Sequence, residues 1–384
     1  MDPSERIAWL ALAAVQGVGP ATFGRLVAGF GGARSVLRAA SDGRLARTAV
    51  EVETGRRLPA EIVDRIVAAA DAPGAATALL DRLGLWTLTP LDPAYPSRFG
   101  VLETAPPVLY GWGDPAALEG HFAVGIVGTR RPTPAGRALA ARVARHVAGD
   151  GAVVVSGLAI GIDGAAHAAT LEAAGRTVAV IGAGHDHPGP RAHRALLRAI
   201  LARGGAVVSE LAPYTPASRG TFPRRNRLLA ALADAVVVVE APSRSGAINT
   251  GHHALEQGRA LFVAPGRPGD PATAGCLRLL RETPARPLVG LPELDEDLAA
   301  LGIGPARAGE RPVTGSDPLA DLGSVERSVA AAISRTPSGI ERLVAATGLP
   351  AGVVGGAVTL LQLRGLARIV DGAVLPAGPL LERG

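Results

Sequence analysis

Between Phe122 and about Val289, short runs of consecutive apolar residues alternate with stretches of helical pattern. A run without polar alternation predicts a strand buried on both faces, which is typical of a parallel sheet covered by helices on both sides. This order predicts a doubly wound, Rossmann-like α/β domain with a mostly parallel sheet. The predicted strands are Ala123–Val127, Ala152–Val155, Thr177–Ile181, Ala206–Ser209, Ala235–Val239 and Ala260–Ala264, with helices at Pro134–Ala148 and Arg191–Ala202 among those between them.

The chain of 384 residues is too long for one ordinary core, and its remaining regions have different patterns. Residues 1–85 predict small helices around a Gly17-Val18-Gly19 hairpin, as in a SAM-like or helix-hairpin-helix domain. Such a hairpin directs backbone N–H groups toward the start of the next helix, a place that suits a phosphate. The alternative is a tight helical turn without a ligand. Residues 86–121 are rich in proline and glycine and predict an extended connector with short strands, which we group with the Rossmann-like domain as residues 86–290.

The C-terminal quarter of the chain predicts a linker and a small domain. Residues 291–321 contain few large apolar groups and predict the linker. Residues 322–384 predict a winged helix, because three short helical patterns are followed by two strand patterns around Asp371-Gly372. The first two helices are expected at residues 325–333 and 339–346, the second capped by Ser338. The third, at residues 350–363, carries almost no charge.

Composition restricts the classes of partner and site. All 39 basic residues are arginines, and the net charge of +5 favours an anionic partner. The single cysteine, Cys276, excludes an internal disulfide framework and a cysteine-rich zinc site. We expect a cytoplasmic protein, since neither a signal peptide nor a long apolar span is evident.

Small polar residues and arginines follow the predicted strands. In a doubly wound sheet, these positions form the ligand edge, where glycines let a phosphate approach backbone N–H groups. A second arginine-rich stretch precedes a predicted helix and adds an anion-binding cluster. The candidate DNA-binding residues are Gly128, Thr129, Arg130, Arg131, Ser156, Gly157, Gly161, Arg191, Phe222, Pro223, Arg224, Arg225, Asn226, Arg227, Ser245 and Gly246.

No catalytic residue, metal site or cofactor is predicted. The dinucleotide Gly-x-Gly-x-x-Gly pattern is missing after the first strand, and a chain without lysine has no Walker-type phosphate loop. Asp163 and His167 share a helix face, but a capping aspartate and a structural histidine explain that spacing. Ser156 lacks the Gly-x-Ser-x-Gly frame of a nucleophile elbow.

Several motifs together resemble the DNA-processing protein A family, also called Smf. They are Val127–Arg130, Ser156–His167, Ser209-Glu210, Phe222–Arg227, Glu240-Ala241 with Ser245-Gly246, and Gly258–Gly266. The resemblance implies a single-stranded DNA-binding homodimer that protects incoming DNA in natural transformation. It also implies that the protein loads the RecA recombinase onto strands covered by single-strand-binding protein, without an enzymatic activity.

The chain departs from the family pattern at residues 189–193, 245–251, 275–280 and 283–284. Residues 189–193 lack the usual tyrosine and asparagine after the third strand, and Leu277 replaces a usual asparagine. Because an apolar patch suits a symmetric contact, we expect Leu277 and Leu280 to belong to the dimer interface.

Two other functions fit the sequence less well. Nucleotide-processing phosphoribohydrolases have a related fold, but residues 241–246 lack their Pro-Gly-Gly-x-Gly-Thr segment. A winged-helix transcription regulator would need more donors on its third helix, where Arg364 is the one charged residue.

Overall fold

The fold is described by a computed structural model, which covers residues 2–47, 51–52, 56–218, 220–305, 322–333, 339–363, 366–370 and 373–376. These residues form two compact units, one ending at Pro305 and one beginning at Ala306. Within the described residues, no single helix is long and apolar enough to cross a membrane. The helices at Ile340–Thr347 and Ala351–Gln362, bent by 109° relative to each other, would together be long and apolar enough, on length and composition alone.

The first unit begins with a small helical domain. Its core is built from the apolar faces of short helices, with Leu12, Leu26 and Ile66 fully enclosed. Its elements are α1 (Pro3–Ala13), α2 (Pro20–Phe30), α3 (Ala33–Ser41), α4 (Arg44–Arg47), β1 (Glu51–Val52), β2 (Arg56–Arg57), α5 (Ala60–Asp71) and α6 (Gly74–Leu83).

A nine-stranded sheet forms the centre of the first unit, in the order β11-β10-β9-β5-β6-β7-β8-β4-β3. The strands from β5 to β11 pair in parallel, whereas β4 and β3 extend the β8 edge as antiparallel strands, so the predicted mostly parallel sheet is confirmed. The strands are β3 (Trp86–Leu88), β4 (Leu109–Gly113), β5 (Ala123–Val127), β6 (Val153–Ser156), β7 (Thr177–Val180), β8 (Ala206–Ser209), β9 (Ala235–Val238), β10 (Ala260–Val263) and β11 (Arg286–Pro287).

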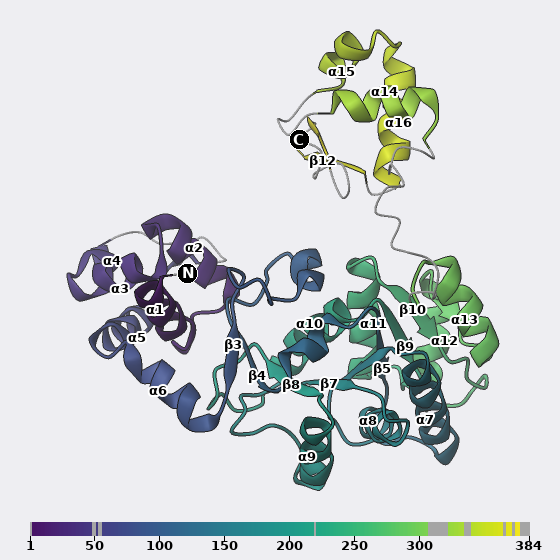
Figure 1. Ribbon diagram of the computed structural model, residues 1–384, viewed down its shortest axis with the longest axis horizontal. Coiled ribbons are helices and arrows are strands. Elements are labelled where there is room, and N and C mark those ends of the chain that lie inside the picture. Colours follow the sequence, from purple (N-terminus) through teal and green to yellow (C-terminus); the bar gives the residue numbers. More distant parts are fainter. Residues whose placement is uncertain are drawn as a thin grey trace. The chain divides into compact units, whose positions relative to one another are not determined.

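Helices cover both faces of this sheet, as the unbroken apolar strands predict. Side chains of one strand face pack on α10, α11 and α12, and those of the other face pack on α7, α8, α9 and α13. Figure 1 shows α10 and α11 above the strands and α8 and α9 below them. The helices are η1 (Ser97–Val101), η2 (Pro115–Glu119), α7 (Pro134–Gly149), α8 (Ile162–Glu172), η3 (Arg191–His193), α9 (Arg194–Ala202), α10 (Thr221–Leu232), α11 (Gly246–Glu256), α12 (Ala274–Glu282) and α13 (Leu291–Ala300).

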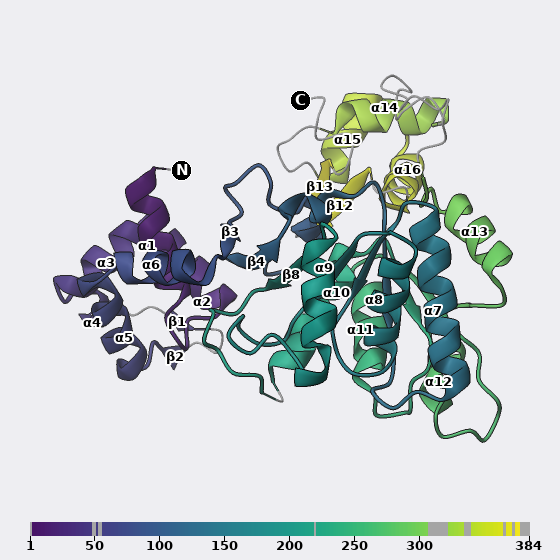
Figure 2. The same ribbon diagram turned by 60° about the horizontal axis from the view of Figure 1, so that its bottom comes forward.

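The helical domain lies beside the β3–β4 end of the sheet in both views (Figures 1 and 2). The Trp9 indole on α1 donates to the Pro107 carbonyl at 2.7 Å. Arg6 donates to both carboxylate oxygens of Asp92, at 2.8 and 2.9 Å. Tyr110 of β4 is part of the helical domain's core. The connector therefore joins the two parts through shared packing.

The predicted linker at 291–321 is wrong at its start. Residues 291–300 form α13, whose Leu294 and Leu298 are buried in the sheet's second core. The spacing of four places both leucines on one helix face, which is enough to dock a short helix despite its acidic remainder.

The described residues of the second unit form three helices and one antiparallel strand pair around an apolar core that includes Val329, Leu343 and Leu361. Its elements are α14 (Ser324–Ala332), α15 (Ile340–Thr347), α16 (Ala351–Leu363), β12 (Ala367–Val370) and β13 (Ala373–Pro376). The helices and strands follow the winged-helix prediction. The expected turn at Asp371-Gly372, the Ser338 cap and Arg364 lie outside the described residues.

Candidate nucleic-acid interface

A pocket of about 350 Å³ lies where the carboxyl ends of β5 and β9 meet. The chain leaves β5 toward β6 and returns to β9 on the other side of β5, so this is the topological switch point of the sheet. The wall comes from the loop after β5, the loop after β9, and the starts of α8, α10 and α11. It includes Gly128, Thr129, Arg130, Ala159, Asp163, Phe222, Arg225, Asn226, Arg244, Ser245, Gly246 and Thr250.

The guanidinium of Arg225 lies deep in this pocket wall. Arg225 is only 7% exposed, and its Nε has no hydrogen-bond partner within the described part of the chain. A Cβ atom at Gly157 would lie 1.6 Å from Arg225 Nη1, so only glycine leaves room for the guanidinium there. A buried guanidinium that keeps one N–H without a partner favours a further acceptor, which points to an anionic ligand.

Asp163 is the acidic neighbour of Arg225. Its carboxylate accepts from the Ala159 backbone N–H at 3.3 Å, near the start of α8. Burial raises the pKa of Asp163, and the charge of Arg225 opposes that shift. Burial likewise lowers the pKa of Arg225, and Asp163 opposes it. A phosphate in the pocket would add a second opposite charge beside the guanidinium and so favour its charged form.

Arg130 supplies an exposed charge at the pocket mouth. Its guanidinium carbon lies 4.8 Å from the centroid of the Phe222 ring, a cation–π contact. Arg131 and Arg244 are also accessible. An aromatic ring beside exposed arginines offers both a stacking face and phosphate donors, the combination that single-stranded nucleic acids use.

The start of α11 forms the wall opposite Arg130. Ser245 caps this helix by accepting from the Ala247 N–H at 3.2 Å. Asn226 is buried and donates to the Gly246 carbonyl and to Asn249, each at 3.1 Å. Asn226 therefore fixes the α11 start against α10.

Glu240 holds the loop after β5 in place. It accepts from the Thr133 N–H at 3.0 Å and from the Thr133 hydroxyl at 2.6 Å. A Cβ atom at Gly136 would lie 2.1 Å from Glu240 Oε2. The sequence analysis noted Glu240 only as a residue after a strand. Thr133, directly before Pro134 at a helix start, was a capping signal that could have indicated this contact.

Three predicted site residues are placed elsewhere or are already occupied. Ser156 is fully buried and its hydroxyl donates to the Ile126 carbonyl at 2.6 Å, so it joins β6 to β5 instead of facing a ligand. Arg227 donates to Glu210 at 2.5 Å and to the Thr104 carbonyl at 2.9 Å, which leaves its guanidinium engaged within the protein. Arg191 is exposed on η3 and does not line the pocket. These placements do not favour direct DNA contacts by Ser156, Arg227 and Arg191, and the contacts stay predictions.

The other predicted residues take distinct places. Gly161 has a φ of +100° at the start of α8, and a Cβ there would lie 2.4 Å from the Thr129 carbonyl oxygen. Pro223 is exposed in the first turn of α10. Arg224 does not line the switch-point pocket and instead lines a second cleft next to α2. Sequence reasoning missed Arg244 and Asp163 as pocket residues, although both adjoin motifs that it had singled out.

His167 is structural, as the sequence analysis favoured. The ring is fully buried, and its Nδ1 lies 2.7 Å from the Thr177 hydroxyl. Burial lowers the pKa of His167 to about 3, with smaller contributions from His193 and Arg225. A histidine in this state is neutral at physiological pH and has no role as a proton carrier there.

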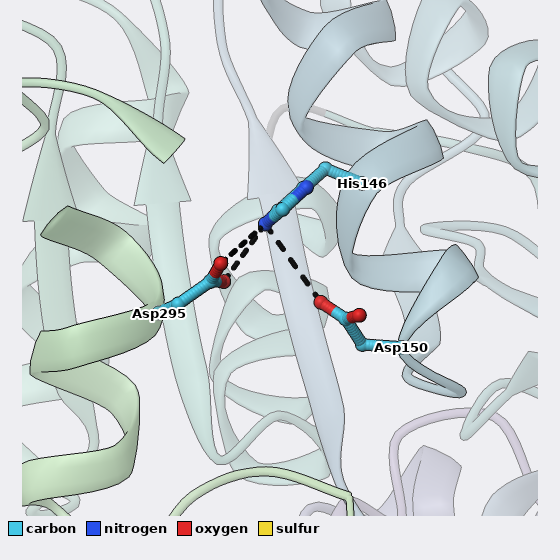
Figure 3. Close-up of side chains that lie close together, drawn as sticks. All are labelled: His146, Asp150 and Asp295. Atoms are coloured by element: carbon cyan, nitrogen blue, oxygen red, sulfur yellow. Dashed lines mark hydrogen bonds and ion pairs between the residues drawn. The ribbon is translucent and has the colours of Figure 1, made fainter. Parts of the chain in front are cut away.

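One cluster among the described residues has the donor types of a metal site, namely His146, Asp150 and Asp295 (Figure 3). His146 Nε2 lies 2.8 and 2.9 Å from the two Asp295 carboxylate oxygens and 3.7 Å from Asp150. His146 is in the last turn of α7, at the end away from the pocket. The contacts join α13 to α7 and account for the cluster without a ligand.

With this geometry in place, the chain can be compared with known proteins. Residues 86–298 match the model of the family described as DNA recombination-mediator protein A. The chain belongs to this family. Residues 3–63 match the DprA-like N-terminal HHH domain, and residues 314–373 match the DprA winged helix domain. The predicted family, helix-hairpin-helix domain and winged helix are thereby confirmed.

Individual DprA and Smf proteins support the same assignment. The Smf protein of Synechocystis is 36% identical over 310 residues, which span 73% of this chain and 77% of that protein. The X-ray structure of DNA processing protein A from Streptococcus pneumoniae superposes with a TM-score of 0.58 at 28% identity, covering 77% of this chain and 97% of that one. The Helicobacter pylori protein, whose structure is described by its single-stranded DNA binding mode, gives a TM-score of 0.51 at 30% identity, covering 56% and 96%.

One departure from the DprA pattern now has a structural account. His193, at one of the positions where the sequence analysis noted a departure, lies with Nδ1 3.0 Å from the Leu158 carbonyl oxygen. Leu158 has a φ of +57°, an uncommon conformation for leucine. His193 thus anchors the strained loop that leads into α8.

Proposed function

We propose that this DprA-family chain binds single-stranded DNA at the switch-point pocket. The observation that carries the proposal is the buried guanidinium of Arg225, whose Nε has no hydrogen-bond partner within the described residues, together with the contact between exposed Arg130 and half-buried Phe222. Arg225 suits a phosphate, and Phe222 offers a ring face to an unstacked base. The binding mode described for the Helicobacter pylori relative supports this choice of ligand.

The pocket favours a single strand over a duplex. It occupies about 350 Å³ at a loop-lined edge and presents no helix to a major groove. A flexible strand can turn one phosphate toward Arg225 while its base lies against Phe222. A stacked duplex keeps its bases paired and cannot do both.

Titration against oligodeoxythymidine and a duplex of the same length tests this proposal. We expect tighter binding of the single strand, with affinity falling as salt rises by a log–log slope of about −0.7 for each phosphate contacted. Equal affinity for the duplex at every salt concentration would contradict the proposal.

Arg130→Ala tests in the same titration whether Arg130 contacts the strand, because the substitution removes an exposed charge and its contact with Phe222. The slope should become shallower by about 0.7 if Arg130 contacts one phosphate. Arg137→Ala is the matched control, since Arg137 is an exposed arginine on α7 that does not line the pocket.

We further propose that the bound strand is protected and passed to the RecA recombinase during natural transformation. The family's description as a recombination mediator supports this step. A binding role, as opposed to an enzymatic one, fits the candidate nucleophiles: the Ser156 hydroxyl is engaged with a backbone carbonyl, and Cys276 is fully buried.

The proposed homodimer contact is on α12. Leu279 is fully buried and Leu280 packs partly on the sheet core, whereas Leu277 is half-buried. Leu277→Glu should raise the dimer dissociation constant at least about tenfold, because association would have to desolvate the carboxylate. The folded variant should load recombinase poorly.

Sedimentation measures the oligomeric state, and circular dichroism checks that the Leu277→Glu variant is folded. Arg281→Glu is the matched control, since it adds the same charge at an exposed position of the same helix. An unchanged dimer would place the contact on another face, and an unfolded product would make Leu277 a core residue.

A further inference from the structure

A second and larger cleft lies between the helical domain and the Rossmann-like domain, within the first unit. Its volume is about 1230 Å³, above the range of ordinary small-molecule pockets, and therefore suits an extended ligand. Its walls come from the hairpin before α2, the segment after β8, the start of α10 and the end of α11. Gly17, Gly19, Tyr110, Tyr214, Arg224 and Gln257 are among them.

The start of α2 presents uncapped backbone amides to this cleft. Gly19 is the N-cap residue and Pro20 follows it, and no side chain caps the helix. Arg65 donates to the Gln16 carbonyl at 3.0 Å and so fixes the hairpin. An 11-residue helix that begins in this way carries partial positive charge and free N–H groups at its first turn.

Arg224 brings a full positive charge to the same place. Its Nη2 lies 3.8 Å from the position that a Cβ atom at Gly19 would take. The Arg224 side chain is 47% exposed, and its ion pair with Glu210 is long at 3.9 Å. Arg224 and Arg225 are neighbours in the first turns of α10, and one faces each site. Both sites are therefore lined by the first turns of α10.

An unsatisfied hydroxyl in the cleft wall indicates a ligand independently of the helix start. Tyr110 is 2% exposed, and its hydroxyl has no hydrogen-bond partner within the described residues. Burial raises the pKa of Tyr110, so the group remains a donor. Tyr214, which is 52% exposed, adds an aromatic ring to the wall. A buried donor without a partner and an accessible ring suit a nucleobase.

We propose that this cleft binds the nucleotides that follow the one in the switch-point pocket. A phosphate lies between the α2 start and Arg224, and the bases enter the cleft beside Tyr214, against the wall that contains Tyr110. The proposal rests on the proposed function, since it continues the path of the same DNA strand. It makes the helical domain part of the DNA site.

Gly19→Asp compared with Gly19→Asn tests the phosphate position. Both residues are good N-caps, so both variants should fold as stably as the parent or better. Only Asp places a negative charge where the phosphate is expected. Against an oligodeoxythymidine of about 20 nucleotides, the Asp variant should bind about fivefold more weakly at low salt, with a slope shallower by about 0.7.

An oligodeoxythymidine of about 4 nucleotides, short enough to occupy the switch-point pocket alone, separates the two proposals. Both Gly19 variants should bind it like the parent. Tyr214→Ala should weaken binding of the long oligonucleotide at least about fivefold, whereas Tyr214→Phe, which keeps the ring, should not.

If the parent binds both oligonucleotides and the Asp and Asn variants have equal affinities and salt slopes, the second site is overturned while the proposed function stands. If the parent binds neither oligonucleotide, the proposed function fails, and the second site fails with it.

Discussion

Replacing Arg225 with methionine is expected to abolish binding of single-stranded DNA, with a loss in affinity of about 100-fold or more. Methionine keeps much of the side-chain length but removes the charge that lies against Gly157. Asp163 would then be a buried carboxylate without its opposite charge, and the remaining pocket arginines, Arg130 and Arg244, are both exposed. The free energy of unfolding should also fall, by about 3 kcal/mol, because the buried carboxylate loses its opposite charge.

The double variant Asp163→Asn/Arg225→Met separates the two effects. It removes both charges, so most of the lost stability should return while DNA binding stays absent. Denaturant unfolding and an oligonucleotide titration on the same samples measure these quantities. Wild-type affinity in the folded double variant would show that the strand binds elsewhere.

Lowering the pH from 7 to 5 is expected to cost about 4 kcal/mol of folding free energy through two buried histidines. Burial lowers the pKa of His167 to about 3 and that of His185 to about 4. The unfolded chain binds a proton at each histidine below about pH 6.5, whereas the folded chain does not. Their stabilisation is therefore complete above pH 6.5 and is lost as the pH falls toward the folded-state values.

The comparison with single variants isolates this effect, because Asp163 and Glu210 have raised pKa values and act in the opposite direction. His167→Gln should remove about 2 kcal/mol of the pH-dependent change, as measured by denaturant unfolding at pH 7 and pH 5. His187→Gln, at an exposed position, is the matched control. The same pH dependence in parent and His167→Gln would mean that His167 is protonated in the fold.

The sheet could be predicted from the sequence because its strands carry an unambiguous signal. Ala123–Val127 is a run of five buried residues without a polar one, and β5 has the same bounds as predicted. The apolar pattern did not predict a helix where only a few of its residues are buried. The two leucines that dock α13 lie among four acidic residues, so composition favoured a linker over the helix that the structure shows.

The motifs of the candidate site could be predicted from the sequence, but the separate positions of their arginines could not. Three arginines within four residues predict an anion cluster, yet on a helix they point in different directions. Arg224 reaches the second cleft, Arg225 the switch-point pocket, and Arg227 the Glu210 carboxylate. Only the tertiary structure shows that Glu210, distant in sequence, occupies one of them.

The packing of β4 on the helical core affects which parts of the chain could be removed without exposing a core. Tyr110 belongs to the helical core while its own strand pairs with β8, and Arg6 bonds across to Asp92. Losing residues 1–85 would uncover apolar side chains on the antiparallel edge of the sheet, a surface prone to pairing with other chains. The N-terminal segment is thus a recognisable sequence module whose core is shared with the connector, whereas the second unit has a core of its own.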